Sequence, residues 1–486
     1  MLVQSRQAEL SESPPLGVIF LLVLPWVHAW APGPLTNLVP LLISWACLVF
    51  VLMFSHQLTS LALAQSWAIA AVLSSAIGLV QFFGLAQALA PAVHVPAYMG
   101  DALGNLRQRN QLASLLVMGM AALLWWRARG LALRHALWML ALLAFGLAAT
   151  ASRTGLLQML FLCTWCWLHR RSHGNGFAWA WACATLGLYL LASMVLPWLL
   201  AITTGHGVVG AVSRMAQLDG CGSRSVLWSN VLHLIGQKPW TGWGWDALRQ
   251  AHYITAYPGP RFCDILGNAH NLPLHMAFAW GVPVALLGVM SVLGWIGLAK
   301  PWRAMTADRQ LAWAIMGVIG LHSMLEYPLW YGPFQIALVF CLWLIGAPIR
   351  RVLNHSALAR GLGILMLAAL CLVAFDYARV RQIYLPADQR WGIWRSQPMQ
   401  AARQSWFFQD TALFAELTTS VVNQDNARWL LQTSQHLLHS SPEPRVIEKL
   451  LESARFLQEE ELFSLHRARF REVYPIAFLA WSQKQS

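Results

Sequence analysis

The sequence has few charged residues for its length. Lys, Arg, Asp and Glu make up 11% of its 486 residues, while hydrophobic residues make up 57%. About a quarter of the residues in an average soluble domain are charged. Acidic residues are scarcest, at 20 against 33 Lys and Arg. This composition excludes an ordinary soluble enzyme and indicates a protein that crosses a membrane several times.

Motifs for nucleotide and metal chemistry are also missing. The chain contains no GxxxxGK[ST] phosphate loop and no glycine fingerprint after a strand. The paired aspartates expected of a metal-dependent sugar transferase are absent, because Asp219, Asp246 and Asp264 stand singly. Cys163 and Cys166 have a metal-like spacing, but no second ligand pair accompanies them. We therefore expect no cofactor and no metal site.

Apolar runs of membrane-spanning length recur through the first 377 residues. A span needs roughly 17–25 mostly apolar residues. We predict about eleven spans, near residues 16–31, 35–55, 58–84, 111–126, 131–151, 154–169, 177–202, 271–299, 311–325, 332–347 and 361–377. The predicted fold class is an all-α polytopic membrane protein. We expect no cleavable signal peptide before the first run, because its start lacks a clear small-residue cleavage site.

The basic residues lie in short clusters between the apolar runs, as the positive-inside rule requires of cytoplasmic loops. Threading eleven spans puts four clusters on one side, at residues 127–134, 170–171, 300–309 and 350–360. The net charge of +13 thus gives no single basic face, and we expect no nucleic-acid binding. The opposite side then receives a polar loop at about 203–270 and everything after residue 377.

The cysteines of the predicted membrane domain, 1–377, fall into two groups, those in the spans and those in the polar loop. Six of the eight cysteines lie in predicted spans, where a thiol acts as a small hydrophobe. The other two, Cys221 and Cys263, lie in the loop. In an oxidising compartment we expect them to form a disulfide, with two free thiols as the alternative.

The tail at 378–486 has a different composition. It is charged and mixed, and apolar residues recur with a helical period in 409–422, 427–441 and 445–470. A Pro-rich break interrupts this pattern at Ser441-Pro442-Glu443-Pro444. We predict a domain of packed helices outside the membrane.

Several polar residues stand where spans end on the side opposite the basic clusters. Arg153 lies in a tight turn between two spans, and Arg224 and Arg214 lie in the polar loop. Guanidinium groups bind phosphate oxygens in bidentate fashion. A lone arginine at the membrane interface, however, often only snorkels, with its stem buried and its charged group in water. His270 and Asn271 mark the point where the loop re-enters the membrane. Histidine is a natural general base for a hydroxyl.

Five segments, in this order, resemble one known family. They are GNLRQRNQLASLL, ATASRTGLLQML, SRSVLWSNVLHLIGQKPWTGWGWD, NAHNLPLHMAFAWGVP and LHSMLEYPLWYG. Together they are similar to bacterial O-oligosaccharyltransferases of the PglL/PilO type, which belong with the O-antigen ligases and polymerases of the Wzy superfamily. The resemblance covers about residues 104–346, and the helical tail looks like the C-terminal extension of the pilin-glycosylating branch.

The resemblance implies a multi-pass enzyme of the bacterial inner membrane, in contact with membrane lipids, with its active site and tail in the periplasm. It would transfer a glycan from undecaprenyl diphosphate to a Ser or Thr hydroxyl of a protein such as type IV pilin, without metal. By matching motif, Arg153 and Arg224 would bind the diphosphate and His270 would activate the acceptor hydroxyl. The residues that would shape the glycan and acceptor site are Gln108, Asn110, Gln111, Arg214, Asn271, Glu326, Tyr327 and Tyr331.

One departure from the family pattern concerns an acidic residue. Many relatives have one shortly before the glycine that follows the His-Asn pair, whereas this chain reads Ala279-Trp280-Gly281. Glu326 is the candidate to supply any role of that acid. Three other functions stay open: an O-antigen ligase acting on lipid A core, a polymerase of repeat units, and a transporter or flippase for a polyprenyl-linked sugar.

Overall fold

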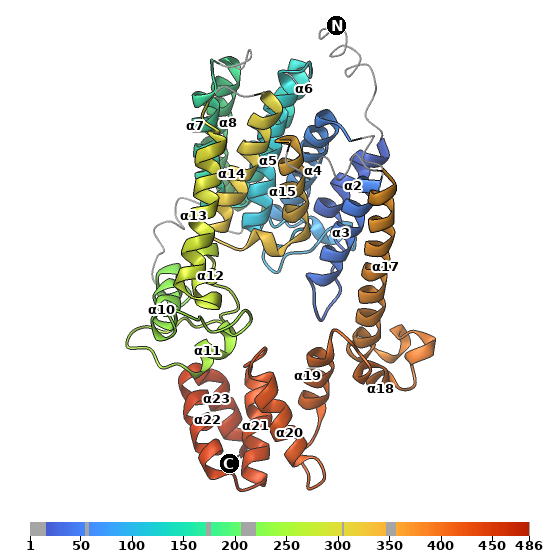
Figure 1. Ribbon diagram of the computed structural model, residues 1–486, viewed down its shortest axis with the longest axis vertical. Coiled ribbons are helices and arrows are strands. Elements are labelled where there is room, and N and C mark those ends of the chain that lie inside the picture. Colours follow the sequence, from blue (N-terminus) through green and yellow to red (C-terminus); the bar gives the residue numbers. More distant parts are fainter. Residues whose placement is uncertain are drawn as a thin grey trace. The chain divides into compact units, whose positions relative to one another are not determined.

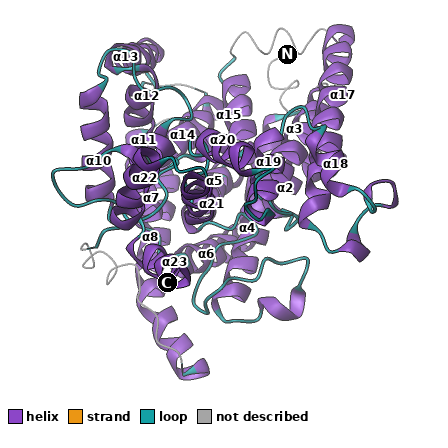
Figure 2. Cartoon of the chain, turned by 90° about the horizontal axis from the view of Figure 1, so that it is seen from below, coloured by secondary structure: helices purple, strands orange, loops and turns teal. Residues whose placement is uncertain are grey.

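The computed structural model describes residues 16–53, 58–171, 176–205, 220–303, 306–346 and 356–485. Within these residues all regular structure is helical, and no strand occurs (Figure 2). The chain is therefore a helical membrane protein. Four helices are long and apolar enough to cross a membrane, at Ser60–Phe82, Ala178–Thr204, Val282–Ala299 and Arg360–Tyr384, and four shorter helices are also apolar. The number of crossings stays a prediction.

Contacts divide the chain into two compact units, which we describe separately. Unit 1 comprises Met1–Leu218 and Ile296–Leu370, and unit 2 comprises Asp219–Trp295 and Cys371–Ser486. The sequence groups the polar loop with the membrane domain, whereas the contacts group it with the tail. The predicted functional boundary near residue 377 stays a prediction.

Unit 1 is a bundle of helices around one central helix (Figure 1). Its helices are α2 (Leu16–Val27), α3 (Leu38–Met53), α4 (Ser60–Phe82), η2 (Ala86–Leu89), α5 (Arg109–Arg127), α6 (Leu133–Ala149), α7 (Arg153–Leu168), α8 (Gly176–Thr204), α14 (Ala307–Ser323), η3 (Pro328–Trp330), α15 (Gly332–Leu344) and the first part of α17 (Ser356–Arg381). Each of these long helices lies on a predicted span. Helix α5 is buried at every position from Gln111 to Trp125, as expected of a helix that is apolar on all sides.

Small residues let the helices of unit 1 approach closely. A Cβ at Gly119 would overlap Ala71 of α4, and one at Gly317 would overlap the ring of Phe161 of α7. Such close packing replaces the hydrophobic driving force that is absent between helices in lipid. The bundle therefore holds its helix ends in fixed positions.

Unit 2 contains two groups of helices. The loop forms α10 (Arg224–Gln237) and α11 (Leu248–Ile254), followed by α12 (Leu272–Trp280) and α13 (Val282–Ala299); the tail follows the end of α17 with η4 (Gln382–Tyr384), η5 (Ala387–Gln389), η6 (Gly392–Trp394), α18 (Pro398–Arg403), α19 (Gln409–Thr419), α20 (Ala427–Leu437), α21 (Pro444–Phe456), α22 (Glu460–Val473) and α23 (Pro475–Gln485). The tail is helical as predicted, and the Pro-rich break separates α20 from α21.

The predicted span at 271–299 is wrong as a single helix. It breaks at Gly281, whose φ is 86°. A Cβ there would overlap the carbonyl oxygen of Trp240, because the preceding loop crosses the break. Val282 N donates to Pro239 O at 2.7 Å, and Trp243 N donates to Phe278 O at 2.8 Å. The loop thus pairs with the backbone that the break exposes.

Candidate functional site

Arg153 begins α7 in unit 1. The residue two positions earlier, Ala151, has a φ of 48°. Ser152 then caps the helix, because its side chain accepts a hydrogen bond from Gly155 N at 3.1 Å. Arg153 is exposed, and its side chain makes no ion pair with any residue that the structure describes. A helix N-terminus carries a partial positive charge, so this end of α7 favours an anion.

A buried polar cluster links the start of α7 to α5 and to the segment after α14. The Ser152 hydroxyl donates to Asn110 Oδ1 at 2.7 Å, and Asn110 Nδ2 donates to Glu326 Oε1 at 3.1 Å. Ser152 is 2% exposed and Glu326 7% exposed. The structure thus brings together three segments that are far apart in the sequence, and each of them holds a predicted site residue: Arg153, Asn110 or Glu326.

These hydrogen bonds continue one helical turn deeper. The sequence predicts that His322 reaches this face, but Ser114 and Gln158 were missed. Ser114 Oγ lies 2.9 Å from His322 Nδ1, and Gln158 Nε2 donates to Ser114 Oγ at 2.7 Å. Ser114 follows Asn110 by four residues, and His322 precedes Glu326 by four. Residues four apart share a helix face, so this spacing was the available signal.

The remaining predicted residues of unit 1 surround the start of α5. Gln108 caps that helix, with its side chain accepting from Gln111 N at 2.6 Å. Tyr327 and Tyr331 stack with ring centroids 5.9 Å apart. Burial raises the pKa of Tyr331, and Tyr327 raises it further, while a side-chain hydrogen bond from Gln111 acts the other way. Tyr331 therefore acts as a neutral hydroxyl group.

In unit 2, His270 immediately precedes the cap of α12. Its φ is 50°, and its backbone N donates to Asn268 Oδ1 at 2.9 Å. Asn271 caps α12 by accepting from Leu274 N at 3.0 Å. The His270 side chain is half-buried. The backbone is therefore held on both sides of His270.

Arg224 begins α10, which packs against the His270 segment. Trp228, one turn further along α10, donates its indole N–H to Ala269 O at 3.1 Å. Residues four apart lie on the same helix face, so Arg224 lies on the face of α10 that contacts the His270 segment. Ser223 caps α10 by accepting from Val226 N at 3.4 Å. Arg214 lies outside the described residues.

The polar loop contains a disulfide and a buried histidine. The structure pairs Cys221 with Cys263, with 5.3 Å between their Cα atoms, which is the predicted disulfide. His252 is 4% exposed. Burial, followed by the nearby Arg261 charge, lowers the pKa of His252 to about 4. This imidazole is therefore neutral, and it contacts Tyr257 Oη and Phe262 O at 2.8 and 3.1 Å.

The loop also contacts the tail helices. Tyr253 Oη lies 3.0 Å from His466 Nδ1 of α22, and Arg249 Nη1 donates to Ser440 O at 3.3 Å. Tyr253 belongs to the same apolar cluster as Leu430, Leu450 and other tail residues. The tail thus supports the loop that carries Arg224 and His270.

Three of the helices that carry predicted site residues start in the same way. A residue in the left-handed region is followed by a polar cap: Arg107 with Gln108, Ala151 with Ser152, and His270 with Asn271. Non-glycine residues rarely adopt a positive φ, and such outliers gather at functional sites. No group of three metal-ligating side chains occurs among the residues searched, which are those the structure describes.

Three sequence families match the chain. Residues 102–126 match the family described as protein glycosylation ligase, residues 138–289 match O-antigen ligase, and residues 310–486 match the C-terminal region of virulence factor membrane-bound polymerase. No solved structure matches.

A curated relative is the general O-oligosaccharyltransferase of Acinetobacter baylyi. It is 25% identical over 286 residues, which are 57% of this chain and 49% of the relative. The chain thus spans about half the length of this relative. These matches confirm the resemblance seen in the sequence motifs, and they place the chain among proteins similar to O-oligosaccharyltransferases of the PglL/PilO type and to O-antigen ligases.

Proposed function

We propose that this protein transfers a glycan from a polyprenyl diphosphate to a hydroxyl group of a protein. The similarity to a general O-oligosaccharyltransferase and to the protein glycosylation ligase family supports this activity. The observation that carries the chemical assignment is Arg153, an exposed cation at a helix N-terminus without an ion pair among the described residues. An enzyme that binds a diphosphate needs such a charge held ready for its ligand.

Arg153 and Arg224 bind the diphosphate and stabilise it as the leaving group. Both stand at the first position of a capped helix, so each adds the helix's partial charge to its own. Negative charge on the diphosphate grows as the bond to the anomeric carbon breaks. Two cations that are already positioned stabilise that charge more in the transition state than in the ground state.

His270 activates the acceptor. Its imidazole takes the proton of the Ser or Thr hydroxyl, the hydroxyl oxygen attacks the anomeric carbon, and the electron pair of the breaking C–O bond leaves on the diphosphate. The fixed backbone around His270 supports this role, because a general base must be held within hydrogen-bond distance of the proton. The arginines make a metal ion unnecessary for charge neutralisation.

The buried cluster of unit 1 orients the groups around the donor. Asn110 and Ser152 bind each other and hold Glu326, while Gln108, Gln111, Tyr327 and Tyr331 surround the same helix start. These groups offer hydroxyl, amide and carboxylate partners for sugar hydroxyls. In this proposal Asn271 of unit 2 also contributes to the glycan and acceptor site, and so does Arg214, which lies outside the described residues.

The finer assignments follow from the family resemblance. The donor is undecaprenyl-diphosphate-linked, the protein lies in the bacterial inner membrane, and both the active site and the tail face the periplasm. The tail helices dock a pilin-like acceptor. These statements carry properties of the resembling glycosylation enzymes over to this chain.

The test is intact-mass measurement of a co-expressed type IV pilin in cells that make a lipid-linked glycan. A glycan-sized mass increase that requires this protein is the expected result. A second function, O-antigen ligation, is favoured by the match of residues 138–289 to that family. Unmodified pilin together with a new lipopolysaccharide band would replace the first proposal by the second, and no product in either assay would favour a transporter.

A further inference from the structure

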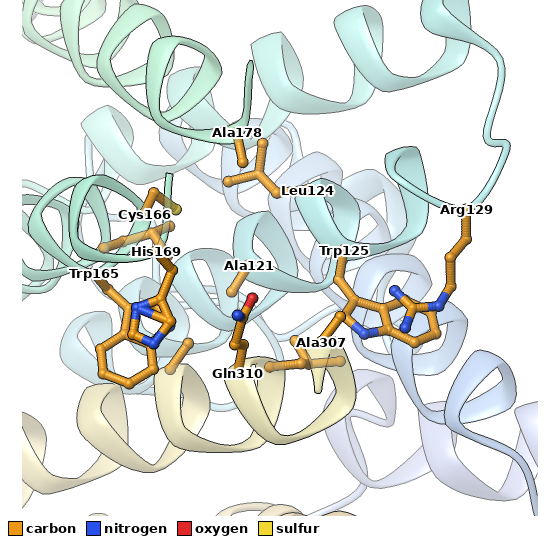
Figure 3. A pocket seen from close by; sticks show the side chains of 13 residues that line it. Ala121, Leu124, Trp125, Arg129, Trp165, Cys166, His169, Ala178, Ala307 and Gln310 are labelled. Atoms are coloured by element: carbon orange, nitrogen blue, oxygen red, sulfur yellow. The ribbon is translucent and has the colours of Figure 1, made fainter. Parts of the chain in front are cut away.

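The cavity of unit 1 is too small to bind an organic ligand. It lies where α5 and α7 end and α14 begins, and it holds about 50 Å³ of free space, whereas ligand pockets usually measure about 300–1,000 Å³. Figure 3 shows Trp165 and His169 of α7 on one side, Trp125 and Arg129 on the other, and Gln310 of α14 between them. These large side chains fill most of the space, and the cavity is therefore part of the packing of the bundle.

An exposed apolar patch in unit 2 has no role in the proposed chemistry. It lies in the segment between α17 and α19 and consists of Trp391, Ile393, Trp406 and Phe407, which are 51%, 74%, 58% and 56% exposed. Single exposed apolar side chains are ordinary on a protein surface, but a group of large ones marks an interaction surface. We call these four residues the apolar patch.

The apolar patch folds back against the end of α17. Trp394 stacks on Trp391 with ring centroids 5.4 Å apart, and it lies 5.5 Å from the ring of Phe375 of α17. Arg379 of α17 lies over the rings of both Phe375 and Trp406, at 5.3 and 5.1 Å. The two halves of the patch, near Trp391 and near Trp406, therefore meet on the same part of the helix.

Buried polar side chains hold both halves of the apolar patch in place. Asp376 of α17 is 0% exposed, and its Oδ2 accepts hydrogen bonds from the backbone N–H groups of Trp406 and Phe407, at 3.0 and 2.9 Å. Gln382, which is 1% exposed, accepts from Trp391 N at 2.8 Å. The backbone of the patch is thus fixed to the end of α17, although the patch side chains are exposed.

Helix α17 relates the apolar patch to the membrane. The helix is long and apolar enough to cross a membrane over Arg360–Tyr384, and only 17% of its most apolar stretch is buried in the protein. Phe375 precedes the helix end at Arg381 by six residues, which is about 9 Å along the axis. The patch therefore lies level with the last turns of the span, where apolar residues give way to Arg379 and Arg381.

We propose that the apolar patch inserts into the phospholipid headgroup layer of the bilayer that α17 crosses, and that it anchors the start of the tail there. Tryptophan favours this layer, because its ring is apolar and its N–H is polar. Arg395, exposed beside the patch, binds a headgroup phosphate. A bilayer fits the patch better than a protein partner does, because the patch is continuous with the exposed apolar surface of α17. This anchoring does not depend on glycan transfer.

The test is photo-crosslinking of the full-length protein in phospholipid nanodiscs. The photoreactive residue p-benzoylphenylalanine, which resembles phenylalanine and reacts with nearby C–H bonds, replaces Phe407 in one variant and Phe456 in another. Phe456 is the matched control, because it is a phenylalanine of similar exposure, 50%, at the end of α21 and outside the patch. Intact-mass measurement should show a phospholipid adduct at position 407 and little or none at position 456.

A second substitution tests whether the whole patch inserts. Ile393→Asp puts a negative charge beside the headgroup phosphates, which repel it, so the variant should lose most of the adduct at position 407. Val421→Asp is the control, because Val421 is 78% exposed and lies outside the patch; it should keep the adduct.

Absence of a lipid adduct at position 407, or equal adducts at positions 407 and 456, would overturn the proposal. An adduct at position 407 that Ile393→Asp leaves unchanged would also overturn it, because Phe407 alone would then touch lipid. A crosslink from position 407 to a second copy of the chain or to another protein would show that the apolar patch is a protein interface instead.

Discussion

The two regions that carry predicted site residues are held together in different ways. In unit 1, Arg153 and Asn110 start helices of a tightly packed bundle, and Asn110 binds both Ser152 and Glu326. In unit 2, Arg224 and His270 lie in a loop whose structure depends on a disulfide, on Trp228 and on contacts with the tail.

The comparison shows that a fixed helix start can be built by two routes. The bundle uses buried helix packing, and the loop uses cross-links between short elements. Both regions then apply the same local device, a left-handed residue followed by a polar cap. Substitutions in the two regions should therefore differ in their effects on stability and on the rate of glycan transfer.

The largest effect is expected from His270→Asn. Asparagine tolerates the left-handed backbone, so the variant should fold, but it lacks the imidazole base. Loss of a general base lowers rates by roughly 10²–10⁴-fold. The measurement is the initial rate of acceptor glycosylation, with His233→Asn, which replaces a half-buried histidine of α10, as the control. A wild-type rate in His270→Asn would remove the imidazole from the mechanism.

In unit 1, Arg153→Ala should lower the transfer rate by about 10²–10³-fold, the effect of losing one charge contact to the leaving group. The matched control is Arg134→Ala, because Arg134 is also exposed in the first turn of a helix, α6. Equal rates for the two variants would show that Arg153 is an ordinary surface cation.

Cys221→Ser should destabilise the loop and leave the bundle intact. A cross-link across a sequence separation of 42 residues contributes about 4 kcal/mol in the chain-entropy model. Limited proteolysis should cut the variant within residues 220–270, whereas Cys371→Ser, which removes an exposed free thiol, should behave like the wild type. Recovery of Cys221 and Cys263 as alkylatable thiols in the wild type would contradict the prediction.

The loop should also lose stability in acid. The folded-state pKa of His252 is about 4, below its unfolded value of about 6.5. Unfolded chains therefore bind a proton that the folded loop does not, and stability falls as the pH drops from about 6.5 to about 4, by on the order of 3 kcal/mol. Protease susceptibility of the loop should rise across this window. His252→Gln should flatten the profile, and an unchanged profile in this variant would exclude His252 as the cause.

The smallest effect compares two helix caps. Ser152→Ala removes the cap of α7 and the hydrogen bond to Asn110, and loss of a cap alone costs about 1 kcal/mol. Ser223→Ala removes the longer cap bond of α10 and an exposed hydrogen bond with Ser225 Oγ. Thermal unfolding should therefore show a larger decrease for Ser152→Ala. The reverse order would mean that the Ser152 to Asn110 bond does not stabilise the bundle.

The positions of the helices could be predicted largely from the sequence. Apolar runs gave the helices of unit 1, because the length of a bilayer span limits the alternatives. The break at Gly281 could not be found, since it depends on the loop at Trp240 that crosses it. Nor could the grouping of the loop with the tail be predicted, because it rests on contacts of Tyr253 and Arg249 with distant residues.

The candidate site was predicted in part. Polar residues at span ends pointed to Asn110 and Glu326, which the structure brings into contact. The hydrogen bond from Ser152 to Asn110 was not predicted, because a serine before a helix is ordinarily only a cap. The roles of Arg153, Arg224 and His270 in chemistry stay predictions.

The most direct test of the account is single-turnover transfer by purified protein from a defined undecaprenyl-diphosphate-linked glycan to an acceptor protein, with donor binding measured in the same preparations. We expect transfer by the wild type, weaker donor binding in Arg153→Ala, and unchanged donor binding with lost transfer in His270→Asn. Absence of transfer by the wild type under donor saturation, or full transfer by His270→Asn, would contradict the division of roles between the two regions.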